Sequence, residues 1–311
     1  MRKNDKIFVA GHRGMVGSAL VRSLRSRGYT NIVVRSRSEL DLLEQAAVRD
    51  FMRSERPAYI FIAAARVGGI HANDTWRAEF LYENLMIESN LIRSAHDADV
   101  DRLMFLGSSC IYPRDCPQPI KEEYLLTGPL EKTNEPYAIA KIAGLKLCEA
   151  MNGQYGRRYA TVMPTNLYGP GDNYDLTSSH VLPALIRKAH EARQRGDDEV
   201  VVWGTGTPRR ELLYVDDLAA ICVSLMEADA SPEPLNIGTG TDLTIAELAA
   251  LVTDVVGFTG KVSYDSSKPD GTPQKLLDVG RLRALGTWPT TPLRDGIAKA
   301  YAAAPFNPGK H

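Results

Sequence analysis

The sequence predicts an α/β protein built on a doubly wound parallel sheet, with a second, smaller α/β region in its later part. Short apolar runs alternate with amphipathic stretches throughout the first half of the 311 residues. A glycine-rich turn follows the first of these runs directly. After about Pro164 the alternation gives way to loops rich in Gly, Pro, Asn and Thr, which indicates that a different arrangement begins there.

The individual elements follow from the same patterns. Buried strands are expected at the apolar runs 7–10, 32–34, 59–64, 103–106 and 160–163. Apolar residues recur at helical spacing between these runs, which predicts connecting helices over 15–27, 81–95 and 137–151. The later part predicts a helix over 181–195, a strand over 200–203 and a helix over 215–228. A cap over the smaller region is expected from residues 247–256, 268–275 and 293–304.

The composition excludes several kinds of protein. The 37 basic and 38 acidic residues nearly cancel and no long run of one sign occurs, so neither a nucleic-acid partner nor a membrane-surface patch is expected. The chain enters a strand-like run without a signal segment, and no stretch approaches the ~18 apolar residues of a membrane span. The four cysteines form no CxxC pair, which argues against a disulfide framework or a metal site: Cys110, Cys116, Cys148 and Cys222. We therefore expect a cytoplasmic protein.

The glycine-rich turn has the context of a dinucleotide site. The run IFVA is followed by Gly11-His-Arg-Gly14-Met-Val-Gly17 and then by a helix, the strand–turn–helix order of a Rossmann domain. Here the glycines let the backbone approach a diphosphate, and the helix N-terminus offers N–H groups to it. A tight turn without a ligand is the alternative interpretation.

The end of the second expected strand points to the kind of dinucleotide. It carries Arg35-Ser-Arg37 and not the acidic residue that binds a free ribose hydroxyl, and guanidinium groups suit a 2′-phosphate. We therefore expect NADP, with a solvated basic loop as the alternative. The expected NADP-binding domain covers residues 1–168, and the chain returns to it around 211–239. Residues 169–210 and 240–311 are expected to form a substrate domain.

Two further segments carry groups suited to proton transfer. Ser108, Ser109 and Cys110 follow a buried strand, at the sheet edge where open α/β folds bind ligands. Tyr137 and Lys141 are four residues apart on an expected helix and so share one face. A nearby ammonium favours ionised tyrosine, which predicts that Lys141 lowers the pKa of Tyr137. A Tyr and a Lys at this spacing can also be simple surface neighbours.

Taken in order, these motifs resemble the extended short-chain dehydrogenases/reductases that act on nucleotide sugars. The similarity extends from about residue 7 to 295, and within that superfamily it is closest to the GDP-L-fucose synthase family. The segments that carry it are GHRGMVGSAL, AAARVGGI, LGSSCIYP, NEPYAIAKIAG, MPTNLYGP, VVWGTGTPRRE, YVDDLA, NIGTG and KPDGTPQKLLD. The resemblance implies an NADPH-dependent epimerase-reductase. Such an enzyme inverts carbons 3 and 5 of GDP-4-keto-6-deoxy-D-mannose and then reduces carbon 4.

The resemblance also implies catalytic roles. Cys110 is the expected base and His180 the expected acid of the epimerisation, since inverting a centre beside a ketone needs two groups that flank the sugar. A thiol and an imidazole have ordinary pKa values on either side of neutrality, so modest shifts would suit both for proton transfer. Ser108 and Tyr137 are expected at the keto oxygen, and Lys141 at Tyr137 and the cofactor ribose. Without the resemblance, Cys110 reads as a small buried side chain and His180 as one of six histidines.

Binding residues follow in the same way. The cofactor is expected on Gly11, Arg13, Gly14, Met15, Val16, Gly17, Arg37, Asp41, Leu42, Leu106, Gly107, Lys141, Pro164, Asn166, Leu167 and His180. The GDP-sugar is expected on Ser108, Ser109, Cys110, Tyr137, Asn166, His180, Lys188, Trp203, Arg210, Asp270 and Lys275. Each nucleotide residue has a structural alternative: a solvated Lys188, a core Trp203 and a turn residue at Asp270.

Three alternatives to this function stay open. A relative could reduce a 3-deoxy or heptose analogue of the same GDP-sugar. A dehydratase or 4-epimerase is disfavoured, because dehydratases of the superfamily usually carry acidic residues where this chain has Ser-Cys-Ile. A non-catalytic NADP-sensing protein of this fold commonly lacks the Tyr or Lys that this chain retains. In relatives the helices at 81–95 and 137–151 form a two-fold contact, so a homodimer is expected.

Overall fold

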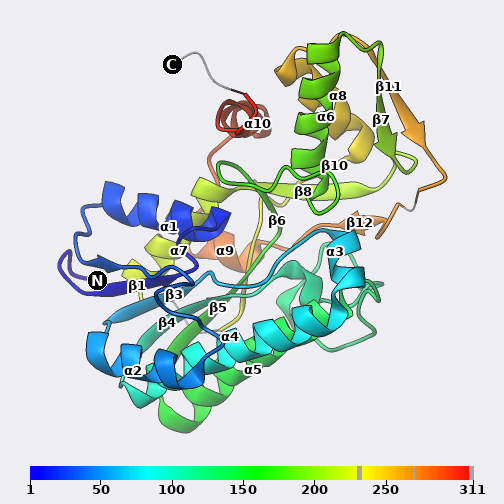
Figure 1. The fold of residues 1–311 in the computed structure, drawn as a ribbon. Coiled ribbons are helices and arrows are strands. Elements are labelled where there is room, and N and C mark those ends of the chain that lie inside the picture. The colour runs from blue at the N-terminus through cyan, green and yellow to red at the C-terminus, as the bar shows by residue number, and fades with distance from the viewer. Residues whose placement is uncertain (230–232, 269, 308–311) are drawn as a thin grey trace.

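The computed structural model describes residues 1–229, 233–268 and 270–307 (Figure 1). Residues 230–232, 269 and 308–311, which the expected domain ranges include, lie outside the described residues. None of the described helices is long and apolar enough to cross a membrane.

A parallel sheet of six strands forms the larger part of the molecule, as the sequence predicts. Its order is β2-β1-β3-β4-β5-β9. The order reverses between β1 and β3, and this reversal opens a crevice at the carboxyl ends of the strands in open α/β folds. The strands are β1 (Ile7–Ala10), β2 (Ile32–Val33), β3 (Tyr59–Ile62), β4 (Arg102–Leu106), β5 (Arg158–Pro164) and β9 (Leu235–Ile237).

Helices cover both faces of this sheet (Figure 1). Alternate residues of a strand point to opposite faces, so Ile7 and Val9 join one buried cluster while Phe8 and Ala10 join another. Two helices, α1 (Met15–Ser26) and α7 (Val215–Glu227), pack in the first cluster. The second cluster lies under three helices, α2 (Gln45–Glu55), α4 (Arg77–Asp97) and α5 (Glu135–Tyr155). Because both faces are covered, the strands read as continuous apolar runs.

The smaller region has its own sheets and its own core. A mixed sheet joins β6 (Asn166–Tyr168), β8 (Arg209–Tyr214), β10 (Asp242–Thr244) and β12 (Gln274–Lys275). A second, parallel pair joins β7 (Glu199–Trp203) and β11 (Lys261–Asp265). These elements share a buried cluster with α6 (Val181–Arg195), α8 (Ile245–Val256) and α10 (Leu293–Ala302). Two short helices, α3 (Ile70–Thr75) and α9 (Gly280–Ala284), complete the described elements together with short 3₁₀ turns.

The structure differs from the sequence predictions in a few places. The helices α4 and α5 are longer than expected at both ends, because their terminal turns carry polar residues that a search for apolar spacing leaves out. Helix α2 was not predicted, and it buries only Val48 and Met52. Among the described residues of the cap segment, 268 and 270–275, only β12 is regular structure. Residues 211–214 lie in β8 of the mixed sheet, so the chain returns to the six-stranded sheet with α7 and β9.

Candidate active site

The glycine turn lies in the crevice where the strand order reverses. Gly11 has φ +84° and a Cβ there would lie 2.7 Å from the backbone nitrogen of Ala64, after β3. A Cβ on Gly17 would lie 2.1 Å from the carbonyl oxygen of Gly11. Gly14 is the N-cap of α1, and no side chain caps the helix. The N–H groups of the first turn, which includes Met15 and Val16, therefore have no side-chain acceptor. This cradle fits the diphosphate of a dinucleotide.

The two arginines after β2 have different surroundings. Arg35 donates to the carboxylate of Glu55 at 2.7 Å and to the carbonyl of Val34 at 2.9 Å, so its guanidinium is already engaged. Arg37 is 74% exposed and its Nε lies 3.7 Å from a carboxylate oxygen of Asp41. Such a loose surface ion pair contributes little. Arg37 is therefore the arginine left to meet a phosphate; Arg13, in the glycine turn, is exposed as well.

The expected cofactor residues after β4 and β5 lie side by side. The backbone N–H of Gly107, which follows Leu106, donates to the carbonyl of Val162 in β5 at 2.8 Å. Beyond Pro164 the chain enters β6 with Asn166 and Leu167, and the Asn166 side chain donates to the Glu211 carbonyl at 2.8 Å. These segments form the carboxyl edge of the sheet next to the glycine turn.

The side chain of Lys141 links α5 to this edge of the sheet through a hydrogen bond. The side chain is buried, and its Nζ donates to the Leu106 carbonyl at 3.0 Å and lies 4.0 Å from a carboxylate oxygen of Glu88. Helix α5 contacts the 3₁₀ turn Ser109–Ile111, and Tyr137, one helical turn before Lys141, interacts there with Cys110. In that turn the Ser108 hydroxyl accepts from the N–H of Cys110 at 3.3 Å. Ser109 is only 3% exposed, whereas Ser108 and Cys110 are half-buried. Ser108 and Cys110 are therefore the accessible side chains of this segment.

The pKa of Tyr137 is raised well above its ordinary value, and this corrects the sequence prediction. Burial is the largest cause, followed by the neighbouring charges of Cys110 and Glu88. Lys141 does not lower this pKa, because its ammonium is directed to Leu106 and Glu88 and lies 5.9 Å from the centre of the Tyr137 ring. Tyr137 is therefore protonated in the free protein, the form that acts as an acid.

Cys110 and His180 are far apart in the sequence, and the charge of Lys275 affects the pKa of both. His180 is the N-cap of α6, and the preceding loop is held by a hydrogen bond from the Gly69 N–H to the Ser178 carbonyl at 2.8 Å. Burial raises the pKa of the Cys110 thiol, and the charge of Lys275 opposes this shift. Burial also lowers the pKa of His180, and Lys275 lowers it further. A thiol and a neutral imidazole thus predominate at neutral pH.

These shifts correct a second expectation. Both pKa values move away from neutrality, whereas the sequence predicted that each group would be set near it. The physical reason is desolvation, which disfavours the thiolate and the imidazolium alike. The His180 residue as a whole still has exposed surface, so a ligand can reach it and change its surroundings.

The raised pKa of Cys110 predicts slow alkylation at neutral pH, because the thiolate is the reacting form. In a Cys116→Ser background, iodoacetamide should label Cys110 slowly at pH 7 and faster as the pH passes 9. Lys275→Met removes the charge that lowers this pKa, so the midpoint should move to higher pH, while the control Lys268→Met should leave it unchanged. Mass spectrometry of the labelled peptide gives the rates. A midpoint below pH 8 would contradict the assignment.

The residues expected at the nucleotide lie on adjoining elements of the smaller region. Trp203, at the end of β7, is 58% exposed, so it is not the core residue of the alternative interpretation. The Nζ of Lys188 lies 5.1 Å from its ring centre and donates to the Val201 carbonyl at 3.0 Å. The Nζ of Lys268 lies 5.6 Å from the same ring. An exposed indole between two ammonium groups suits a negatively charged aromatic ligand.

Asp270 and Arg210 order the segment that leads to Lys275. The Asp270 carboxylate accepts from the N–H of Thr205 at 2.7 Å and from its hydroxyl at 2.8 Å. The Arg210 guanidinium donates to the Thr272 carbonyl at 2.7 Å. Lys275 pairs with Arg210 in the ladder of β12 and β8. Arg210 and Lys275 therefore place two positive charges close together.

Two buried carboxylates were missed by the sequence reasoning. Glu211 has no exposed surface and accepts from the backbone N–H groups of Thr239, Gly240 and Leu277, which fixes β12 beside the site. Glu88 is 2% exposed and lies under Lys141. Each could have been noticed as a charged residue on the apolar face of a helix or inside an apolar strand. A search for apolar periodicity ignores such single exceptions.

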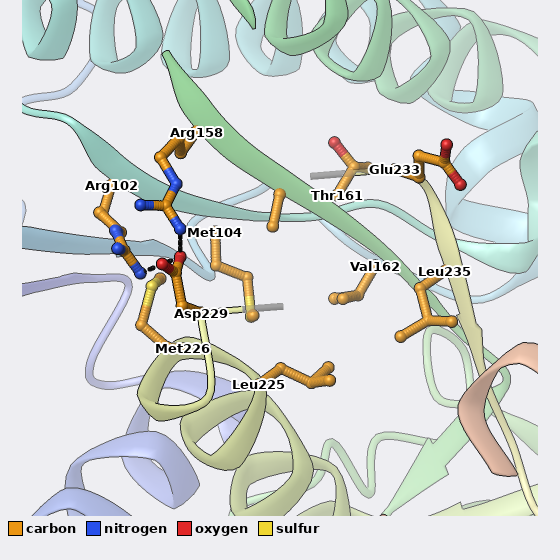
Figure 2. Close-up of a pocket in the computed structure, with 11 residues that line it drawn as sticks. Arg102, Met104, Arg158, Thr161, Val162, Leu225, Met226, Asp229, Glu233 and Leu235 are labelled. Atoms are coloured by element: carbon orange, nitrogen blue, oxygen red, sulfur yellow. Dashed lines mark ion pairs between the residues drawn. The ribbon is translucent and has the colours of Figure 1, made fainter. Parts of the chain in front are cut away.

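The sheet also encloses a small cavity at its opposite edge. Figure 2 shows Arg102 and Arg158, the first residues of β4 and β5, reaching the carboxylate of Asp229, with which both form ion pairs. The cavity measures about 20 Å³, room for one water molecule and not for a sugar nucleotide. Its position at the amino ends of the strands separates it from the residues described above.

Comparison with known proteins identifies the relatives of this arrangement. The pattern of the NAD dependent epimerase/dehydratase family matches residues 7–238. GDP-L-fucose synthase 1 of Arabidopsis thaliana is 56% identical over 96% of this chain and 93% of its own. GDP-L-fucose synthase of Escherichia coli (strain K12) is 55% identical over 96% of this chain and 95% of its own. The chain belongs to the GDP-L-fucose synthase family within the NAD dependent epimerases/dehydratases.

A solved structure of this kind has the same fold. The GDP-mannoheptose C4 reductase MlghC of Campylobacter jejuni, with NADP bound, superposes with a TM-score of 0.89 and is 39% identical, covering 97% of this chain and 99% of its own. The fold class predicted from the sequence is confirmed by the parallel sheet and by these relatives.

Proposed function

We propose that this protein is an NADPH-dependent epimerase-reductase. It converts GDP-4-keto-6-deoxy-D-mannose to GDP-L-fucose by epimerisation at carbons 3 and 5 and reduction at carbon 4. The observation that carries the proposal is the juxtaposition of two proton-transfer sets. The charge of Lys275 shifts the pKa of both Cys110 and His180, and Cys110 in turn contributes to the raised pKa of Tyr137. A simple ketoreductase needs only the tyrosine and its lysine.

The residues of the crevice fit NADPH, which when bound supplies the hydride for carbon 4. The glycine turn and the first turn of α1 would hold the diphosphate, because the backbone leaves no room for side chains there. Arg37 would hold the 2′-phosphate. Lys141 and the segments after β4 and β5 would border the ribose and the nicotinamide.

Arg37→Asp should weaken NADPH binding by roughly 10- to 100-fold, the contribution of charge-assisted hydrogen bonds to a phosphate. NADH binding should change far less, because it lacks the 2′-phosphate. Fluorescence titration with both nucleotides measures this, and Arg25→Asp, an exposed arginine at the other end of α1, is the control. Equal loss for the two nucleotides would reject the role of Arg37.

In the epimerisation, the Cys110 thiolate removes the proton beside the keto group, and His180 in its imidazolium form, which bound substrate must make more populated, returns a proton to the opposite face of the sugar. The negative charge that develops on the keto oxygen accepts hydrogen bonds from the hydroxyls of Ser108 and Tyr137. Bound substrate must raise the thiolate population of Cys110, and the ammonium of Lys275 is the nearby charge that favours it. In the reduction, Tyr137 donates its proton to the oxygen on carbon 4, which its raised pKa allows.

The GDP end is met by local charge, since the whole chain is close to neutral. Lys188, Arg210 and Lys275 would hold the diphosphate, and the exposed face of Trp203 would stack on the guanine. Asp270 would accept hydrogen bonds at the nucleoside.

One reaction in deuterated water tests the whole proposal. The protein is mixed with NADPH and GDP-4-keto-6-deoxy-D-mannose, and the product is analysed by NMR. Deuterium at carbons 3 and 5 together with the L-fuco configuration is expected. Reduction without deuterium incorporation would instead indicate a C4 reductase, the activity named for MlghC. NADPH binding without turnover would favour a sensor.

We further propose the NADP-binding domain at 1–168 with the return around 215–239, which begins with α7, and the substrate domain at 169–214 and 240–311. A homodimer through α4 and α5 is supported by their exposed Tyr82 and Ile139, which light scattering can test. A cytoplasmic location is supported by the four free cysteines.

A further inference from the structure

The carboxylate of Glu88 lies inside the protein without a hydrogen-bond partner among the described residues. It projects from α4 and is 2% exposed. A buried carboxylate without partners is costly, so a sequence that retains one must gain something from its charge. None of the proton or hydride transfers described above uses this carboxylate directly.

The nearest positive charge is the ammonium of Lys141, 4.0 Å away. Lys141 is also buried, and its Nζ donates a hydrogen bond to the neutral Leu106 carbonyl, which cannot balance its charge. Burial lowers the pKa of Lys141, and Glu88 is the largest opposing influence. Burial raises the pKa of Glu88 to about 7, opposed by the Lys141 charge and the Gly144 backbone.

The contact between α4 and α5 has room for this carboxylate. Gly144 lies one turn after Lys141, and a Cβ there would lie 2.9 Å from Oε2 of Glu88 and 2.6 Å from the Phe105 ring. The absence of a side chain at 144 therefore lets the carboxylate approach the helix that carries Lys141 and Tyr137.

Other titratable groups face the pair from α5 and from the end of β4. Burial raises the pKa of both Tyr137 and Cys148 on α5, and the charge of Glu88 adds to each shift. Cys110, after β4, acts on Lys141. Tyr137, Cys148 and Cys110 have no positively charged form. The ammonium of Lys141 is therefore the group that the Glu88 carboxylate stabilises.

We propose that Glu88 is a positioning residue for the reduction: its buried carboxylate keeps Lys141 charged and fixed against the Leu106 carbonyl, where the lysine supports Tyr137 and the cofactor. The effect on turnover rests on the function proposed above. The effect on Lys141 itself does not, so the two can fail separately.

The direct test follows the ammonium of Lys141. Protein labelled with ¹³C at lysine Cε is titrated by NMR, and the Lys141 signal is identified by its loss in Lys141→Arg. In Glu88→Gln the midpoint should fall by about one pH unit or more, the shift that an opposite charge within ~4–6 Å produces. An unchanged midpoint in a folded Glu88→Gln protein would overturn the proposal, whatever the activity.

The kinetic test compares the pH profile of NADPH oxidation at saturating GDP-keto sugar. Removing the carboxylate lowers the Lys141 pKa, so the alkaline fall in kcat should begin about one unit earlier, about a tenfold loss on that limb. Glu88→Asp retains the charge at a longer distance and should restore part of the profile. Glu149→Gln removes a half-buried carboxylate of α5 that pairs with Lys146 and should change nothing.

Circular dichroism and thermal unfolding report whether each variant is folded. If Glu88→Gln does not fold, Glu88→Asp and Gly144→Ala, which displaces the carboxylate, decide the question: both should lower the Lys141 midpoint. A loss of kcat without movement of the alkaline limb in these variants would show a packing role only and reject the proposal.

Discussion

Tyr137→Phe is expected to lower the rate of NADPH oxidation with GDP-4-keto-6-deoxy-D-mannose by about 10³-fold, the typical contribution of a positioned acid. The substitution removes the hydroxyl that protonates the oxygen on carbon 4. It retains the ring, which packs edge-on against Phe80 at 6.3 Å, so the fold should be preserved. Stopped-flow absorbance at the nicotinamide band measures the rate directly.

Epimerisation should survive this change better than reduction. Ser108 still donates to the keto oxygen, and Cys110 and His180 are untouched, so deuterium should continue to enter the sugar from the solvent. Tyr155→Phe is the matched control, because Tyr155 is 45% exposed at the end of α5. Retention of more than a tenth of the reduction rate in Tyr137→Phe would show that another group is the acid.

Cys110→Ser and His180→Gln are expected to slow deuterium incorporation at carbons 3 and 5 by about 10²- to 10³-fold each, while NADPH binding stays within a few-fold. A serine hydroxyl ionises far less readily than a thiol, and a glutamine side chain cannot transfer a proton at neutral pH. NMR of the sugar follows exchange at each carbon, and fluorescence titration follows cofactor binding.

The structure supplies the controls for this pair. Cys116→Ser changes a half-buried thiol of the same loop, and His190→Gln changes a histidine of α6 whose Nδ1 is hydrogen bonded to the Tyr301 hydroxyl. Neither control should reduce exchange beyond the effect of any loss of stability. Full exchange in both Cys110→Ser and His180→Gln would remove these residues from the mechanism.

Much of the fold could be predicted from local pattern. The runs at β1 and α6 were placed at the observed bounds, because one is continuously apolar and the other has a clear apolar face. Helix α2 escaped detection, because two buried apolar residues are too few to establish a period. The short strands of the mixed sheet, such as β12 with two residues, form through pairing with distant segments and leave no local signal.

The candidate site divides in the same way. Motif spacing brought out the glycine turn, Ser108, Tyr137 and Lys141, since each lies directly after a strand or on one helix turn. Glu88 could not be found from spacing, because its importance depends on facing Lys141 across two helices. Which of two arginines is available, Arg35 or Arg37, depends on the position of Glu55 in an unpredicted helix.

The sequence by itself determined the fold class and the family, and it also determined which residue types stand ready for proton transfer. Only the tertiary structure decided their protonation: Tyr137 and Cys110 with raised pKa values, His180 with a lowered one, and Lys141 held beside a buried carboxylate. The reason is physical. Strand and helix patterns are local, whereas a pKa depends on desolvation and on charges brought from every part of the chain.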